Sequence, residues 1–561
     1  MRAFRFTSII DMNPSHRLRA PIHIAMIASC AAFAVASSAF ATPSGIGLSA
    51  LLAANPGLNG SGVNVAQVEA SLTSSTSSTS TSTDEFEVNP VAVNQPQSLF
   101  IYINDQGAQS TQYNSTDGSS HADTVGNLFY GGVPTGSSSA YGVAPGVASI
   151  SNYDAGWFGG NNVGLTENST TQMISPTGHT QPTVNNAQVI NQSFIFQIPS
   201  TFTTIAADQY MQNIDWAYDN YVNTYNTIIV SAVGDYTGAA GTTNMINPPA
   251  TAYNSIAVGA YGSNAETEVG PTFDGRSKPD IVAPAGATSY AAPLVSGAAA
   301  IMIQAANEST GYSAATAGTW SQSQYNANAV LPQTVKALLM NGAVQPTGWT
   351  HTATAPLDPR YGAGVLNVDD AYQILAAGRA AATASDTSTA VMTTPTITQA
   401  SGWDVETLDN NGPHAATNLS TFVDHYVFTA VAANPGEADS FKATLVWNAQ
   451  TNSGTPVNTT FSEKQTPIFL ELFNAANGSL VSESISTVDN VQQIDAMLTP
   501  GTNYDLQVFT SGSNFSNSDV YALAFSTSTV AVATPEPAAL GLMAIGAGLL
   551  LLRRNRRTPG I

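Results

Sequence analysis

Three residues of this chain are of the types that catalyse acyl transfer, and they occur in a defined order. Glu69 lies near the end of GSGVNVAQVEAS, His121 lies in SSHADTVGN, and Ser289 lies in KPDIVAPAGATSYAAPLVSG. A serine hydroxyl is a weak nucleophile until a neighbouring imidazole takes its proton, and an acid behind the imidazole fixes its tautomer and stabilises the imidazolium. The order acid, histidine, serine is therefore a candidate catalytic triad.

Each of these residues also has a purely structural interpretation. Ser289 precedes an alanine-rich apolar stretch, where serine is a common helix N-cap, so a capping role stays open alongside catalysis. His121 could be a surface histidine at the start of a helix. Glu69 could be a strand-end carboxylate in a degenerate enzyme, because the acid of a triad must be placed to well under about 1 Å.

The elements that must position these residues alternate between strands and helices up to about residue 380. Residues at helical spacing, from Met211 to Tyr221, separate some of the apolar β-rich runs. This alternation predicts an α/β fold with a doubly wound, mostly parallel sheet covered on both faces. The expected strands are 64–69, 99–103, 188–193, 227–233, 255–260 and 280–283.

The second half of the chain has a different pattern. Alternating runs such as HYVFTAV, KATLVW, IFLELF and YDLQVF are separated by Gly, Asn and Pro, which predicts an antiparallel β-sandwich over 401–530. An Ala/Thr/Ser-rich stretch at 381–400 is expected to be a linker. The α/β domain then spans 42–380, with a Ser/Thr-rich insertion at 71–84 that cannot pack.

The motifs of the first domain, taken in order, resemble those of the subtilisin-like (S8) serine peptidases. GSGVNVAQVEAS, SSHADTVGN, YGVAPGVASI and GATSYAAPLVSG match the family patterns GxGVxVAVIDTG, NSHGTHVAG, YGVAP and NGTSMATPHVAG. The resemblance implies a subtilisin-like fold and a serine endopeptidase that cleaves polypeptide substrates through an acyl-enzyme at Ser289. No cofactor is expected, and no metal either, because no loop has the spacing of a recognisable calcium site and solvated carboxylates are the expected state of the scattered acidic residues. The second domain resembles the β-sandwich appended to several secreted subtilases.

The chain departs from the family at several positions of the expected active site. Glu69 stands where the family has aspartate, and Asp235 in SAVGD stands at the oxyanion asparagine. An ionised Asp235 would repel the developing oxyanion, and only the protonated acid could donate to it. Ser193, Phe194 and Ile195 replace the small residues of the primary-pocket wall, so we expect a shallow pocket that favours small P1 residues. Simple core packing is the alternative for Phe194.

Both ends of the chain are expected to be targeting segments. Residues 1–41 combine arginines, an apolar run and the small-residue site Ala39-Phe40-Ala41, which is typical of a secretory signal peptide. Residues 534–557 contain a PEP motif, an apolar run and an arginine cluster, and resemble the PEP-CTERM sorting signal, with an ordinary tail anchor as the alternative. The resemblance implies an exosortase as processing partner, transient anchoring in the membrane, and export to the cell envelope or beyond in a Gram-negative bacterium.

Charge and cysteine content narrow the range of partners. Of the 15 Lys and Arg residues eight lie in the two terminal segments, so the exported body is strongly acidic. Nucleic acid and anionic membrane surfaces are therefore unexpected partners. Cys30 is the only cysteine and lies within the expected signal peptide. Two alternatives to the enzyme remain: an inactive subtilase-fold binding or matrix protein of the envelope, and a structural protein associated with exopolysaccharide.

Overall fold

A computed structural model of the chain describes residues 26–27, 43–70, 85–134, 142–177, 186–236, 245–308, 312–313, 319–408, 421–430, 437–451, 463–464, 467–511 and 519–531. The predicted Ser/Thr-rich insertion and the predicted sorting signal lie outside these residues, and so does the predicted signal peptide except for strand β1 (Met26–Ile27). These three predictions therefore stay predictions.

The first domain is built on an eight-stranded sheet that is parallel except at one edge. All neighbouring strands run parallel apart from β3 and β4, which pair antiparallel. This topology confirms the predicted mostly parallel α/β sheet. The strand order is β12 (Ile281–Pro284), β11 (Ile256–Tyr261), β10 (Ile228–Ala232), β8 (Val189–Gln192), β2 (Asn64–Glu69), β5 (Ser149–Asp154), β3 (Phe100–Ile103) and β4 (Gln109–Ser110).

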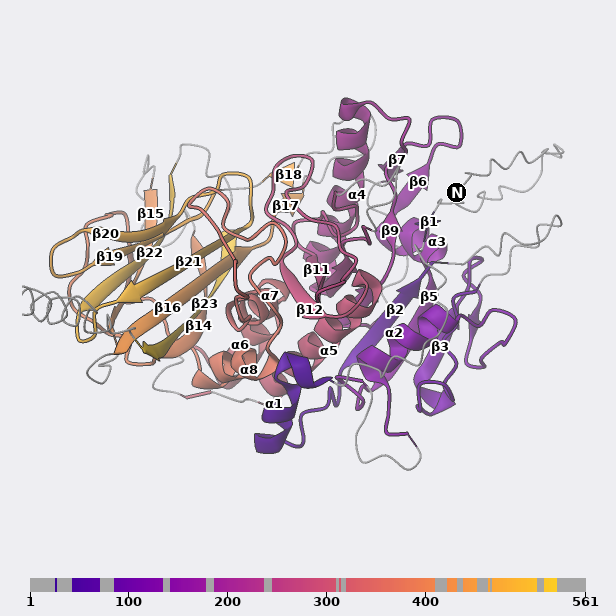
Figure 1. The fold of residues 1–561 in the computed structure, drawn as a ribbon, viewed down its shortest axis with the longest axis horizontal. Coiled ribbons are helices and arrows are strands. Elements are labelled where there is room, and N and C mark those ends of the chain that lie inside the picture. The colour runs from indigo at the N-terminus through magenta and orange to yellow at the C-terminus, as the bar shows by residue number, and fades with distance from the viewer. Residues whose placement is uncertain are drawn as a thin grey trace, which may run out of the picture.

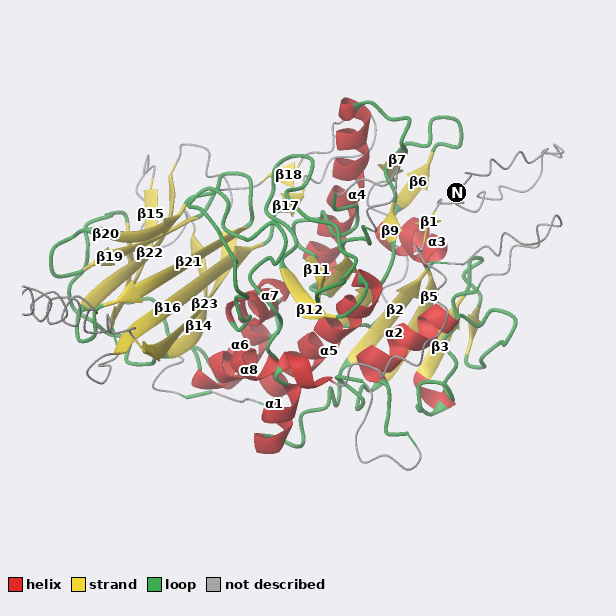
Figure 2. Ribbon diagram, in the orientation of Figure 1, coloured by secondary structure: helices red, strands yellow, loops and turns green. Residues whose placement is uncertain are grey.

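Helices cover both faces of this sheet, as Figures 1 and 2 show. Alternate residues of β2 belong to two different hydrophobic clusters: Val65 packs in the cluster that contains α5, and Ala66 and Val68 pack in the cluster that contains α4. This alternation follows from the two-residue period of a strand and explains why the strands are apolar throughout. The helices are α1 (Leu48–Ala54), α2 (Ser120–Tyr130), α3 (Ala155–Trp157), α4 (Thr204–Tyr225), α5 (Thr288–Asn307), α6 (Gln322–Ala329), α7 (Pro332–Asn341) and α8 (Val368–Ala377).

Helix α5 is the central helix of the larger cluster. It is long and apolar enough to cross a membrane by length and composition alone, but 89% of its most apolar window is buried inside the protein. A helix that is apolar on all sides belongs in such a core. The burial of α5 fixes the position of its first turn, which contains Ser289.

The second domain is the predicted antiparallel β-sandwich, drawn at the left of Figure 1. Its two sheets enclose a separate cluster that includes Trp447, Phe441 and Leu470. One sheet has the order β13 (Ala384–Asp386), β15 (Thr421–Thr429), β22 (Asn503–Ser511), β19 (Phe469–Asn474) and β20 (Leu480–Ser484). The other has the order β14 (Ser401–Leu408), β23 (Asp519–Ala531), β16 (Glu437–Trp447) and β21 (Val491–Leu498).

Three short antiparallel pairs complete the described strands. They are β1 with β9 (Ile195–Phe196), β6 (Leu165–Glu167) with β7 (Ile174–Pro176), and β17 (Gln450–Thr451) with β18 (Glu463–Lys464).

Residues 381–400 are not the free linker that their composition predicts. Strand β13 lies within this stretch and pairs with β15, and the backbone N–H groups of Thr396 and Ile397 both donate to Val427 O. Ile397 is buried in the core of the sandwich. The stretch therefore forms the edge of the sandwich, because its backbone groups pair with β15 even though its side chains are small and polar.

The two domains share a hydrophobic and hydrogen-bonded junction. Helix α7 packs against β16 and β23. At its end, Asn341 Nδ2 donates to Ala524 O at 3.1 Å and to Thr444 Oγ1 at 3.2 Å. Trp403 of β14 is fully buried in the cluster of the first domain.

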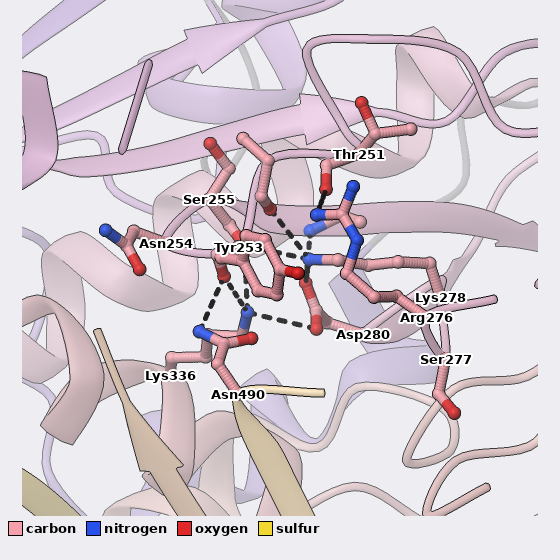
Figure 3. Close-up of polar contacts among 12 residues, drawn as sticks. Thr251, Tyr253, Asn254, Ser255, Arg276, Ser277, Lys278, Asp280, Lys336 and Asn490 are labelled. Atoms are coloured by element: carbon pink, nitrogen blue, oxygen red, sulfur yellow. Dashed lines mark hydrogen bonds and ion pairs between the residues drawn. The ribbon is translucent and has the colours of Figure 1, made fainter. Parts of the chain in front are cut away.

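A group of buried charges lies beside this junction (Figure 3). Asp280 accepts from Lys278 Nζ at 2.7 Å and forms an ion pair with Lys336 Nζ at 3.0 Å, and all three side chains are at most 2% exposed. Lys336 Nζ also donates to Tyr253 O, the carbonyl that accepts from Asn490 Nδ2 of the β-sandwich at 2.9 Å. Lys336 of the first domain and Asn490 in the loop before β21 therefore both donate to the carbonyl of Tyr253.

Candidate active site

The predicted acid and base of the triad lie side by side. Glu69 is the last residue of β2, and His121 lies in the first turn of α2, whose N-cap Ser119 accepts from the N–H of Ala122. His121 Nδ1 is 2.8 Å from Glu69 Oε2, and the two side chains are 6% and 2% exposed. A hydrogen bond through Nδ1 leaves Nε2 as the nitrogen that can take a proton from a nucleophile.

Gln67 holds the other oxygen of Glu69, and the sequence analysis missed this residue. Gln67 Nε2 donates to Glu69 Oε1 at 2.8 Å and to Ala122 O at 2.9 Å, while Tyr130 Oη donates to Gln67 Oε1 at 2.5 Å. Gly126 of α2 leaves room for this arrangement, since a Cβ there would lie 2.9 Å from Tyr130 Oη. The available signal was the two-residue spacing from Glu69, which puts both side chains on one face of the strand.

The environment of His121 favours its charged form. Burial by itself lowers the pKa of His121, but the charge and hydrogen bond of Glu69, together with the charge of Asp235, outweigh burial and raise the pKa above its usual value of 6.5. An imidazolium formed during a reaction is therefore stabilised by the carboxylate of Glu69.

Ser289 lies in the first turn of α5 and does not cap it. The N-cap is Ala287, which makes no side-chain capping bond. Instead, Asp235 Oδ1 accepts from both the N–H and the Oγ1 of Thr288, each at 2.7 Å. The capping role left open for Ser289 is thus wrong: a carboxylate from another loop satisfies the start of the helix, where negative charge is also favoured by the helix dipole.

Pro293 determines how the backbone of Ser289 is held. A proline has no N–H to donate to the carbonyl four residues earlier, which here is Ser289 O. Ser193 Oγ donates to this carbonyl at 2.9 Å, and Asn191 Nδ2 donates to Ser193 Oγ at 3.0 Å. The family-like SxAxP pattern and the serine after β8 therefore form one unit.

The hydroxyl of Ser289 points toward the same segment. Ser289 Oγ donates to Ser193 O at 3.3 Å, and among the described contacts none joins it to His121 by a hydrogen bond. His121 nevertheless lies against the next residue, with its ring centroid 6.0 Å from that of Tyr290. Catalytic hydrogen bonds are often long or misaligned in unliganded enzymes and tighten when substrate binds.

A small pocket opens next to Ser289. Its lining residues are Ser193, Phe194, Ile195, Ala232, Gly234, Asp235, Thr288 and Ser289. Phe194 lines it but is only 3% exposed and packs against Phe196 in the cluster around α4, so core packing accounts for most of its surface. The predicted wall thus lies beside the candidate nucleophile.

The site lies along the carboxyl edge of the sheet. Glu69 ends β2, Ser193 follows β8, Asp235 follows β10, and Ser289 begins the helix after β12. In open α/β sheets this edge is where ligands bind. Residues far apart in sequence thereby place a hydroxyl, an imidazole and two carboxylates at one edge of the sheet, and these are the groups that nucleophilic acyl transfer uses.

Comparisons with known proteins bear on this arrangement. The family model described as "Subtilase family" matches residues 55–364. No curated protein matches the chain. Among solved structures, the self-cleaved protease domain of PatA is 18% identical, with 56% of this chain and 97% of that chain covered and a TM-score of 0.30. A lanthipeptide protease is 16% identical, with 56% of this chain and 87% of that chain covered and a TM-score of 0.30. The pre-peptidase C-terminal domain of a collagenase from Bacillus anthracis is 14% identical, with 22% of this chain and 87% of that chain covered and a TM-score of 0.14.

Proposed function

Because the chain belongs to the subtilase family of serine peptidases, we propose that it is an exported endopeptidase whose catalytic triad is Glu69, His121 and Ser289. Membership of this family implies a polypeptide substrate. The observation that carries the assignment of the triad is the buried 2.8 Å contact between His121 Nδ1 and Glu69 Oε2, at the edge of the sheet where Ser289 begins α5.

In the proposed reaction, Ser289 Oγ attacks the carbonyl carbon of the scissile bond while its proton passes to His121 Nε2. The carbonyl oxygen takes the negative charge of the tetrahedral intermediate. Collapse of this intermediate breaks the C–N bond, and the proton moves from Nε2 to the leaving amine. Water then attacks the acyl-enzyme, with the same imidazole taking its proton and returning one to Ser289 Oγ.

Asp235 takes the oxyanion position in this proposal. Its Oδ1 is occupied by two bonds from Thr288, so Oδ2 is the atom that would carry a proton and donate it to the oxyanion. A carboxylic acid can act as such a donor while it is protonated. Glu69 stabilises the imidazolium, and Gln67 positions Glu69 through its bond to Oε1.

A phosphonate probe for active-site serines tests the proposed function. We expect labelling of wild-type protein at Ser289, located by peptide mass spectrometry, and no labelling of Ser289→Ala or His121→Ala. Hydrolysis of a casein substrate should be lost in the same two variants, and their combination should cost little more than either alone, since the triad acts as a unit. Additive losses would contradict the triad.

An inactive subtilase-fold binding protein is the second candidate. It is favoured by one observation, the bond of Ser289 Oγ to Ser193 O in place of one to His121. Absence of labelling in folded wild-type protein at every pH between about 4 and 9 would favour this candidate.

Export is part of the proposal and is supported by the two terminal sequences alone. We propose that a signal peptide is removed after Ala41, that the segment 534–557 anchors the protein until an exosortase-type enzyme cuts it, and that the mature protein lies in the envelope or outside a Gram-negative cell. Cell fractionation with mass spectrometry of the mature termini tests this. An N-terminus upstream of residue 42 would contradict it.

A further inference from the structure

The segment Glu266–Glu268 joins the two loops that form the site. Glu266 N donates to Gly286 O at 2.9 Å, in the loop that leads to Ser289. Glu268 N donates to Gly234 O at 2.9 Å, in the loop that carries Asp235. The segment therefore sets the distance between the candidate nucleophile and the candidate oxyanion residue.

The side chain of Glu268 lies directly behind Gly234. Glu268 is 5% exposed, and its Oε2 accepts from Asn247 Nδ2 at 2.8 Å. Asn247 in turn donates its N–H to Val233 O at 3.3 Å. Gly234 has a φ of +109°, and a Cβ there would lie 2.6 Å from Glu268 Oε2. The carboxyl thus fills the space that the glycine leaves, one residue before Asp235, and the reaction proposed above does not use it.

The charges around Glu268 favour its neutral form. Burial, with a smaller contribution from the charge of Asp235, raises the pKa of Glu268 to about 8 against the lowering effect of the Asn247 bond. Glu266, on the same segment, also has its pKa raised by burial and by the charge of Asp235. Among the residues that the structure describes, Asp235 is the charged group that acts on Glu268, and its charge does not offset a negative charge there.

We propose that Glu268 is a positioning residue for the peptidase reaction: its neutral carboxyl supports the turn at Gly234 and Asp235, and its ionisation above neutral pH inactivates the enzyme. This proposal rests on the proposed function. An ionised Glu268 behind Asp235 would oppose formation of the oxyanion, since like charges in a buried site repel strongly. The loss of activity at alkaline pH should then follow ionisation of Glu268.

The variant Glu268→Gln separates shape from charge. The amide oxygen can still accept from Asn247 Nδ2, but the side chain can no longer ionise. We would measure the rate of phosphonate labelling at Ser289, and kcat and KM for a peptide substrate, between about pH 5 and pH 10. A group with a pKa of about 8 is about nine-tenths ionised at pH 9. The rate at pH 9 divided by the rate at pH 7 should therefore be about tenfold higher in Glu268→Gln than in wild type. KM should change little.

Glu266→Gln is the matched control, because it removes a carboxylate from the same segment without touching Gly234. The rate of labelling of Glu266→Gln should fall at alkaline pH as it does in wild type. Labelling with the same pH profile in wild type and Glu268→Gln would overturn this proposal alone. No labelling of wild type at any pH would overturn the proposed function, and this proposal with it.

A measurement on wild-type protein covers the case in which Glu268→Gln does not fold. Carbon-13 NMR of labelled glutamate carboxyls should show one group that titrates together with the alkaline loss of labelling. A loss of labelling that follows no carboxyl titration would overturn the proposal.

Discussion

At the scale of single residues, the charge of Glu69 raises the pKa of His121, the proposed general base. Glu69→Gln keeps the size of the side chain but removes the charge that, with its hydrogen bond, raises the pKa of His121. We expect kcat to fall by about 10³- to 10⁴-fold, as when a triad carboxylate becomes an amide, and the acid limb of kcat/KM to move to lower pH. Asp105→Asn, in the loop after β3, is the control. An unchanged acid limb would show that His121 is not the base.

Asp235 is the second residue whose charge the structure makes testable. In Asp235→Asn the amide oxygen can still accept from Thr288 and the NH₂ group can donate at every pH, so kcat near neutral pH should rise by about 10²-fold, the value of one oxyanion donor. A lower kcat at every pH would contradict the oxyanion role.

At the scale of elements, the break that Pro293 makes in α5 gives Ser193 its importance. Ser193→Ala removes the donor to Ser289 O, and Pro293 cannot replace it. The Ser289 carbonyl is partly buried, so leaving it without this partner should cost less than the about 1 to 3 kcal/mol of a fully buried group, and both the free energy of unfolding and kcat should fall.

The double variant provides the control for this prediction. Pro293→Ala restores an N–H four residues after Ser289, so adding it to Ser193→Ala should recover part of the lost stability. Urea unfolding of the wild type and the three variants measures the coupling free energy. Strictly additive effects would show that the two residues do not share this carbonyl.

The short strand β9 contributes Ile195 to the pocket wall, and in the proposed function this wall would determine specificity at P1. Ile195 lines the small pocket beside Ser289, so peptides with alanine at P1 should have a higher kcat/KM than peptides with phenylalanine. Ile195→Gly should raise kcat/KM for phenylalanine at P1 by about tenfold or more. A cleavage library of the wild type dominated by aromatic P1 residues would contradict this assignment of the wall.

At the scale of the whole molecule, the junction of the two domains depends on buried charges. Asp280 is the carboxylate shared by Lys278 and Lys336, so Asp280→Asn leaves two buried lysines without it and should lower the free energy of unfolding by about 3 to 5 kcal/mol at neutral pH. Asp274→Asn is the control, because the side chain of Asp274 is 24% exposed and its loss should cost less.

The pH dependence of this effect has a definite sign. Burial lowers the pKa of Lys336 to about 7, against a usual value of 10.5. Between these values the unfolded chain binds more protons than the folded protein, so stability should rise with pH. The cost of Asp280→Asn should therefore be smaller near pH 9 than near pH 7, because neutral Lys336 needs no counter-ion. Urea unfolding at both pH values measures this, and an equal cost at both would contradict it.

The sequence by itself determined the architecture and the positions of the candidate triad. Strand and helix periods are local properties, so they predict the parallel sheet, the β-sandwich and the placement of Glu69 and Ser289 at the ends of their elements. Local composition predicted a linker at 381–400, where the structure has strand β13 paired with β15. This prediction was wrong because the pairing of a strand depends on a partner that lies elsewhere in the chain.

Only the tertiary structure decided what surrounds those residues. Ser193 on the carbonyl of Ser289 and Glu268 behind Gly234 are contacts that arise when loops at the ends of different strands meet at one edge of the sheet, and Gln67 joins its strand neighbour Glu69 to the carbonyl of Ala122 in α2. The residue types of Ser193 and Glu268 carry no signal of these contacts, because a serine or glutamate in a loop is ordinarily solvated. Burial changes this: it takes away water as a partner, and each polar group must then find its partner in the protein.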